Sequence, residues 1–150
     1  MIVDTSVLIA LFRREPEAPA FVRVMDEAPV LRVSAGTYVE LGAVVDGSRD
    51  PAASRMLDSY LDDWGIRIEP VTETQARIAR EAYRDFGRGS GHPARLNFGD
   101  CFAYALARDL GEPLLFKGSD FSQTDIEIVI EPIKRRRLSE IVGSYEASPP

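Results

Sequence analysis

The sequence predicts a single α/β domain, a parallel sheet of four to five strands flanked by helices. Short apolar segments alternate along the chain with longer segments whose apolar residues recur at helical spacing, which is typical of this class. The 150 residues suit one ordinary domain with one core. The hydrophobic content of 45% and the charged content of 28% are those of a globular protein.

Five apolar segments are predicted to form strands. They are residues 1–3, 30–33, 66–71, 114–116 and 126–130. The first is wholly apolar, as expected of a central parallel strand. Pro70 indicates that the third strand ends near its position.

Six helices are predicted between these strands. They cover about residues 5–11, 17–27, 34–45, 51–64, 72–86 and 97–110. Ser34 is a suitable N-cap, and Pro16 and Pro51 suit helix starts. Gly65 and Gly111 are typical of helix ends.

The chain divides into a domain at residues 1–132 and a tail at residues 133–150. The tail begins with the basic run Lys134-Arg135-Arg136-Arg137 and continues with small and polar residues. Such a composition predicts fraying.

Composition also indicates the cellular compartment of the protein. No apolar run approaches the roughly 20 residues that span a bilayer, so no membrane partner is expected. The N-terminus does not have the pattern of a signal peptide, because Asp4 interrupts it early. The single cysteine, Cys101, fits a reducing environment. The sequence therefore predicts a cytoplasmic protein.

The net charge of −6 argues mildly against a nucleic-acid partner, because cations drive phosphate binding. Basic residues are nevertheless clustered. They gather at Arg13 and Arg14, at Arg77, Arg80, Arg84 and Arg88, and at residues 134–137. A basic rim around an acidic centre would suit RNA.

Four carboxylates occupy positions that call for an explanation. Asp4 and Asp120 follow apolar strand-like runs, Glu40 interrupts an apolar helix, and Asp100 lies near the start of another. In a parallel sheet such positions converge beyond the carboxyl ends of the strands. Gathered carboxylates repel one another, and Mg²⁺ or Mn²⁺ relieves that repulsion because both ions prefer oxygen ligands. The pattern predicts a metal-dependent nuclease.

Three segments carry a resemblance to a known family. They are Ile2-Val3-Asp4-Thr5-Ser6, the segment from Phe98-Gly99-Asp100 to Ala107, and Leu114-Leu115-Phe116-Lys117-Gly118-Ser119-Asp120-Phe121. Together with Glu40, they resemble the PIN-domain ribonucleases and, more narrowly, the VapC toxins of bacterial toxin–antitoxin pairs. The resemblance implies an endoribonuclease that uses Mg²⁺, with Mn²⁺ as a substitute, and that a small antitoxin inhibits.

The resemblance also implies residue roles. Asp4, Glu40, Asp100 and Asp120 match the family's acidic quartet, and Ser6 matches its hydroxyl beside the first acid. Ser119 departs from the family, which more often has asparagine there. Asp125 is close enough in sequence to replace or assist Asp120.

Each acid also has a structural interpretation. Asp4 and Asp100 could stabilise helix starts, Asp120 could shape a turn, and Glu40 could face water. Cleavage of RNA by a histidine pair is implausible, because the chain has only His92.

Two rival functions are a phosphatase of the haloacid-dehalogenase type and a non-catalytic, Mg²⁺-binding signalling module similar to a receiver. The first needs an acid two residues after Asp4, where the chain has Ser6. The second normally has adjacent acids after its first strand, which are not evident here.

Two protein partners are expected. A homodimer is predicted from apolar residues on two early helices, namely Tyr38, Val39, Leu57, Tyr60, Leu61 and Trp64. The antitoxin is predicted to place an arginine of its C-terminal segment among the four carboxylates and an apolar helix in a groove near the early helices.

Overall fold

The structure is a computed structural model that describes residues 1–129. The predicted tail at residues 133–150 lies outside the described residues, as does the end of the fifth predicted strand. No helix in the described part of the chain combines the length and apolar character needed to cross a membrane.

The sheet has four parallel strands in the order β3-β2-β1-β4, which confirms the predicted class. The strands are β1 (Ile2–Val3), β2 (Arg32–Ser34), β3 (Arg67–Glu69) and β4 (Leu114–Leu115). The fifth predicted strand is present only as an isolated bridge, in which Ile128 pairs with Leu114. β1 is therefore central.

Helices connect the strands, as predicted. They are α1 (Thr5–Phe12), α2 (Ala18–Asp26), α3 (Ala35–Asp46), α4 (Pro51–Asp63), α5 (Glu73–Phe86) and α6 (Asp100–Leu110), and a short 3₁₀ turn, η1 (Phe121–Gln123), follows β4. Side chains of Asp4, Ser34, Asp50 and Thr72 accept hydrogen bonds from backbone N–H groups at the starts of α1, α3, α4 and α5.

The predicted start of α6 is three residues too early. The helix begins at Asp100, whose backbone N–H donates to Asn97 Oδ1 at 2.9 Å. Asn97 thus satisfies a free N–H group of the helix from outside it.

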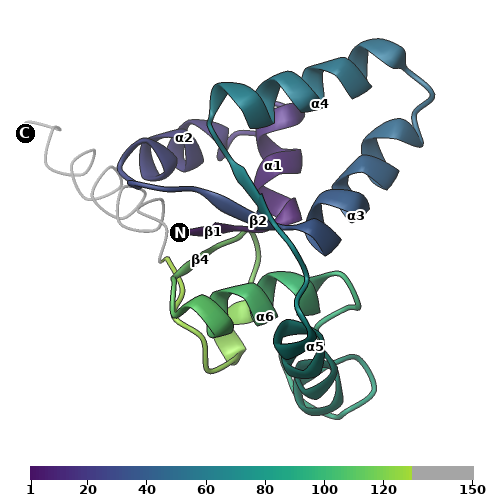
Figure 1. Cartoon of the computed structure of the whole chain (residues 1–150), viewed down its shortest axis with the longest axis vertical. Coiled ribbons are helices and arrows are strands. Elements are labelled where there is room, and N and C mark those ends of the chain that lie inside the picture. The colour runs from purple at the N-terminus through teal and green to yellow at the C-terminus, as the bar shows by residue number, and fades with distance from the viewer. Residues whose placement is uncertain (130–150) are drawn as a thin grey trace, which may run out of the picture.

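The sheet separates two hydrophobic clusters (Figure 1). Ile2 and Leu114 pack with α5 and α6 on one face, whereas Val3 and Leu115 pack with α1, α2, α3 and α4 on the other. The alternation follows from the two-residue period of a strand.

The predicted dimer surface needs correction. Leu57 and Leu61 are buried in the protein's own core and only 6% exposed each, because α4 packs them against the cluster that contains Val3. Tyr38, Tyr60 and Trp64 are half-buried, and only Val39 is largely exposed.

Candidate metal centre

The four predicted acids lie beyond the carboxyl end of the central strand. Asp4 follows β1, Glu40 is in the second turn of α3, Asp100 opens α6, and Asp120 is in the turn after β4. Figure 1 shows the first turns of α1, α3 and α6 meeting there, and α3 contacts both other helices. The topology therefore brings together residues that are distant in sequence.

Asp4 is buried, with 5% of its surface exposed. Its Oδ2 accepts hydrogen bonds from the backbone N–H of Ser6 at 3.0 Å and from Ser6 Oγ at 2.6 Å. Burial raises the pKa of Asp4, the bonds from Ser6 oppose that rise, and the nearby charge of Asp120 adds to it.

Ser6 joins two parts of the site. Its Oγ donates to Asp4 and accepts a hydrogen bond from the backbone N–H of Lys117 at 2.9 Å. Lys117 opens the turn that carries Asp120, so this hydroxyl ties the first acid to the segment of the last one.

Glu40 lies between the starts of α1 and α6. Thr5 Oγ1 donates to Glu40 Oε2 at 3.1 Å. On its other side the carboxylate packs so closely against the backbone of Gly99 that an added Cβ there would overlap it. Only glycine fits at position 99 with Glu40 in this place.

Asp100 accepts a hydrogen bond from the backbone N–H of Asn97 at 2.6 Å. Burial is the main cause that raises its pKa from 3.8 to about 6, and the charges of Asp4, Asp120 and Glu40 add to the rise. All three other acids therefore lie within electrostatic range of Asp100.

No cation neutralises this group within the described residues, where none of the four acids forms an ion pair. Oxygen donors with uncompensated negative charge fit Mg²⁺ or Mn²⁺. In residues 1–129, however, no three Asp, Glu, His or Cys side chains already converge closely enough to hold a metal ion. An ion would have to draw these carboxylates closer together.

Asp125 belongs to a different cluster. It accepts hydrogen bonds from Tyr104 Oη at 2.6 Å and from the Arg108 guanidinium at 3.1 Å. Arg108 also donates to Tyr104 Oη at 2.6 Å. Asp125 is not among the charges that shift the pKa of Asp4 or Asp100.

Sequence reasoning missed three neighbours of the acids: Thr5, Asn97 and Gly99. The spacing of Asn97 and Asp100, three residues apart at a helix start, is that of a capping box and could have revealed their mutual hydrogen bonds. No sequence signal marks the approach of Gly99 to Glu40, because the two residues are brought together only by the packing of α3 against α6.

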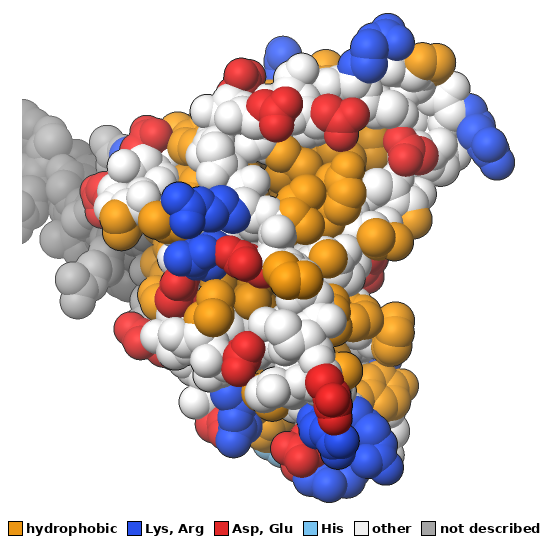
Figure 2. Space-filling view, in the orientation of Figure 1, with side chains coloured by type: hydrophobic (Ala, Val, Ile, Leu, Met, Phe, Trp, Pro, Cys, Tyr) orange, Lys and Arg blue, Asp and Glu red, His pale blue; other side chains and the backbone are white. Residues whose placement is uncertain are grey.

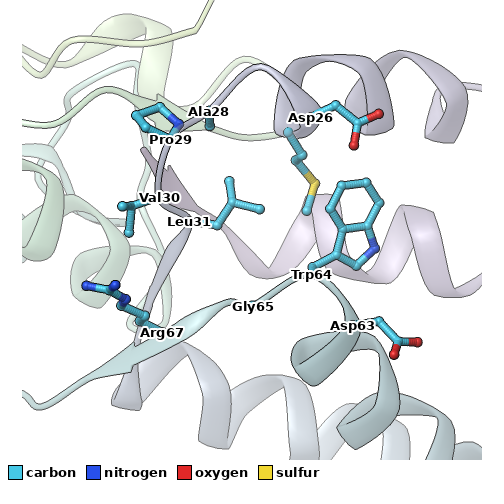
Figure 3. Close-up of a pocket in the computed structure, with 10 residues that line it drawn as sticks. Asp26, Ala28, Pro29, Val30, Leu31, Asp63, Trp64, Gly65 and Arg67 are labelled. Atoms are coloured by element: carbon cyan, nitrogen blue, oxygen red, sulfur yellow. The ribbon is translucent and has the colours of Figure 1, made fainter.

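A pocket of about 420 Å³ lies at the other end of the sheet, where β2 and β3 begin. Figure 3 shows Asp26 and Asp63 on either side of the Trp64 indole, with Arg67 across the pocket. None of the four predicted acids lines it, so it is separate from the candidate metal centre.

A mostly apolar groove of about 590 Å³ lies between α1, α2 and α4. We call it the early-helix groove; it is lined by Leu11, Arg14, Glu15, Pro16, Ala18, Pro19, Val22, Tyr60 and Trp64. It corresponds in place to the groove predicted near the early helices.

The chain is similar to proteins of known family. The sequence matches the PIN domain family over residues 1–127. It is 54% identical over 131 residues to Ribonuclease VapC28 of Mycobacterium tuberculosis, which covers 87% of this chain and 98% of that protein.

Among the solved structures that share the fold are two from bacterial toxin systems. One is the Mycobacterium tuberculosis VapC20, a sarcin–ricin loop cleaving toxin, with a TM-score of 0.69 and 21% identity over 87% of this chain and 98% of that one. The other is a toxin–antitoxin complex from Klebsiella pneumoniae, with a TM-score of 0.65 and 18% identity over 86% of this chain and 95% of that one. With the family match and the 54% identity, the chain belongs to the PIN-domain family and, within it, to the VapC ribonucleases.

Proposed function

We propose that this protein is the toxin of a toxin–antitoxin pair and hydrolyses RNA phosphodiester bonds with the help of Mg²⁺, for which Mn²⁺ can substitute. Asp4, Glu40, Asp100 and Asp120 hold the ion. Its relatives, named as ribonucleases, favour this function over a receiver-like signalling module.

One observation carries the proposal. The pKa of Asp100 is raised to about 6 by burial and by the three other acids, without any ion pair to offset their charge within residues 1–129. Such an arrangement is unfavourable in an empty site and becomes favourable around a divalent ion.

The side chains around the acids have supporting roles. Ser6 fixes the orientation of Asp4, and Thr5 fixes that of Glu40. Asn97 holds Asp100 through its backbone N–H. When bound, the metal supplies positive charge that activates water and stabilises the phosphate oxygens.

The test is RNA cleavage with added Mg²⁺, Mn²⁺ or excess EDTA. We expect activity with either ion and none with chelator. Asp4→Asn should abolish cleavage, whereas Asp58→Asn, an exposed acid on α4, should retain it. Cleavage by the purified protein in excess EDTA, unchanged by Asp4→Asn, would contradict the mechanism.

Asp120, rather than Asp125, is assigned as the fourth acid. The charge of Asp120 raises the pKa of both Asp4 and Asp100, whereas Asp125 is bonded to Tyr104 and Arg108. Asp120→Asn should therefore abolish cleavage and Asp125→Asn should leave most of it. The reverse result would exchange the two assignments.

The early-helix groove is proposed to hold the antitoxin. Its apolar lining suits an amphipathic helix, and the four carboxylates attract an arginine from the segment that follows. The structural neighbour from Klebsiella pneumoniae is itself a toxin–antitoxin complex.

Antitoxin binding is tested by co-purification with the product of an adjacent small open reading frame. Val22→Asp, in the groove, should weaken the complex and leave RNA cleavage intact, whereas Leu110→Asp, an exposed residue of α6, should change neither. Inhibition that survives loss of every arginine near the antitoxin's C-terminus would rule out the arginine contact.

A homodimer is also proposed, now through α3 and α4. Val39, Val44 and Met56 are 67%, 45% and 42% exposed, which leaves apolar surface on these helices. Sedimentation should show a dimer at micromolar concentration, and Val44→Asp should shift it to monomer. A monomer under all these conditions would refute the pairing.

A further inference from the structure

Phe98 is unusually exposed for an aromatic side chain. It is 74% exposed, although it stands between Asn97 and Gly99 in the turn that leads into α6. Water contact with so much apolar surface contributes nothing to folding, so the ring calls for another explanation.

The ring is nevertheless held in place. Asn97 and Asp100 bond each other reciprocally across the turn, at 2.6 Å and 2.9 Å. The ring of Phe98 meets that of Phe102 edge to face, with centroids 5.1 Å apart and planes at 87°. Phe102 in turn lies directly against Gly36 at the start of α3. Phe98 is therefore an exposed but well-supported platform.

The platform is adjacent to the candidate metal centre. The residue that follows it, Gly99, touches the Glu40 carboxylate, and the next is Asp100 itself. A molecule stacked on Phe98 would lie at the edge of the four acids.

Two arginines belong to the backbone segments next to the platform. Arg88 and Arg95 are exposed and form no ion pair within residues 1–129. The backbone N–H of Arg88 donates to Leu96 O at 3.0 Å, which holds Arg88 next to the segment that runs from Arg95 to Phe98. Figure 2 shows Lys and Arg side chains gathered over α5, the helix that ends two residues before Arg88, with hydrophobic side chains next to them.

Arg95 also has a backbone conformation that favours glycine, with φ at +52°. A residue other than glycine lowers the stability of the fold at such an angle. The Arg95 side chain is exposed, so it does not offset this cost by packing.

We propose that Phe98, Arg88 and Arg95 form a ledge that binds single-stranded RNA, with an unpaired base stacked on Phe98 and neighbouring phosphates on the two arginines. Aromatic stacking combined with cations is how proteins bind unpaired RNA. The inference rests on the proposed function and adds to it where the substrate lies. A second copy of the chain is disfavoured as the occupant, because two such cationic ledges would repel each other.

The experiment measures the binding of a short fluorescein-labelled single-stranded RNA by fluorescence anisotropy, with Ca²⁺ in place of Mg²⁺ to limit cleavage. Phe98→Leu should weaken binding roughly tenfold, and Phe98→Tyr should restore it. RNAs with a single abasic nucleotide locate the stacked base. If the missing base is the one that stacks on Phe98, Phe98→Leu should cause no further loss of affinity.

Arginine-to-glycine variants separate folding from binding. Arg95→Gly and Arg49→Gly relieve similar backbone angles, at φ +52° and +58°, so neither should lower the Tm. Only Arg95→Gly should weaken RNA binding, and it should reduce the slope of log K against log salt by about 0.7. Arg49 lies at the far end of α3 and serves as the matched control.

Unchanged RNA affinity in both Phe98→Leu and Arg95→Gly would overturn the ledge. Conversion of a dimer to a monomer by Phe98→Leu, with RNA affinity unchanged, would assign the ring to a second copy and also overturn it. If the wild-type protein cleaves RNA and these variants bind RNA with wild-type affinity, only the ledge proposal is refuted. If it binds RNA through the ledge without cleaving it, the ledge stands and the proposed nuclease function fails.

Discussion

Asp100→Asn should stabilise the metal-free protein while abolishing its response to metal. In the unfolded chain Asp100 ionises near its ordinary pKa of 3.8, whereas in the folded protein its pKa is about 6. The folded state therefore binds more protons between these two values. The free energy of unfolding of the metal-free protein falls as the pH rises from about 3.8 to about 6, and the loss persists above that range.

The size of the effect follows from the shift. A shift of about two pKa units corresponds to about 3 kcal/mol. Asp100 is only partly buried, so solvent screening reduces the expected gain from Asp100→Asn to about 1–2 kcal/mol at pH about 7.5. Asparagine keeps an oxygen that can accept the hydrogen bond from Asn97.

The assay is urea unfolding in EDTA at pH about 7.5 and at pH about 4, where the gain should shrink because Asp100 of the wild type is protonated. Asp58→Asn, an exposed acid of α4, should change stability by less than about 0.5 kcal/mol. Added Mg²⁺ should raise the Tm of the wild type and not that of Asp100→Asn. A variant less stable than the wild type in EDTA at the higher pH would refute the reasoning.

Three further predictions concern neighbours of the four acids and of Asp125. Gly99→Ala should displace Glu40, because the new methyl group overlaps its carboxylate. Calorimetric titration should then show roughly tenfold weaker Mg²⁺ binding. An unchanged Mg²⁺ affinity would argue against Glu40 as a ligand. Ser6→Ala removes the bond to Asp4 and the acceptor for the Lys117 N–H, so unfolding measurements should show a loss of about 1 kcal/mol, together with weaker Mg²⁺ binding. Tyr104→Phe should also cost about 1 kcal/mol in the same measurement and leave the Mg²⁺ affinity intact, since Tyr104 bonds Asp125 rather than the four acids.

The order of strands and helices could be predicted because it depends on local patterns. The apolar runs before Asp4 and Asp120, the helical spacing after Ser34 and Pro51, and the ends at Gly65 and Gly111 are all short-range signals. The placement of Asp4 and Asp120 after strands, and of Asp100 at a helix start, followed from the general geometry of parallel sheets.

Features that depend on packing between distant segments could not be predicted. The contact of Glu40 with Gly99 needs the docking of α3 on α6. Leu57 and Leu61 have the helical spacing of an apolar stripe, but spacing alone does not say whether the stripe meets the protein's own core or a partner. Within residues 1–129, the fifth predicted strand pairs with β4 through the single bridge of Ile128 with Leu114, and its apolar sequence alone does not specify how far that pairing extends.

The residues of the two proposed sites are synthesised at different times. The residues that line the early-helix groove all precede Gly65, whereas the acids include Asp100 and Asp120. A ribosome making this chain therefore releases every residue of the groove before it releases the last two carboxylates, although the single domain folds as a unit. Leu115 of β4 belongs to the same core cluster as Leu11 and Leu57 beneath the groove, so the groove takes shape only once β4 has been made. An antitoxin bound there as proposed would therefore meet the chain just as its acids come together.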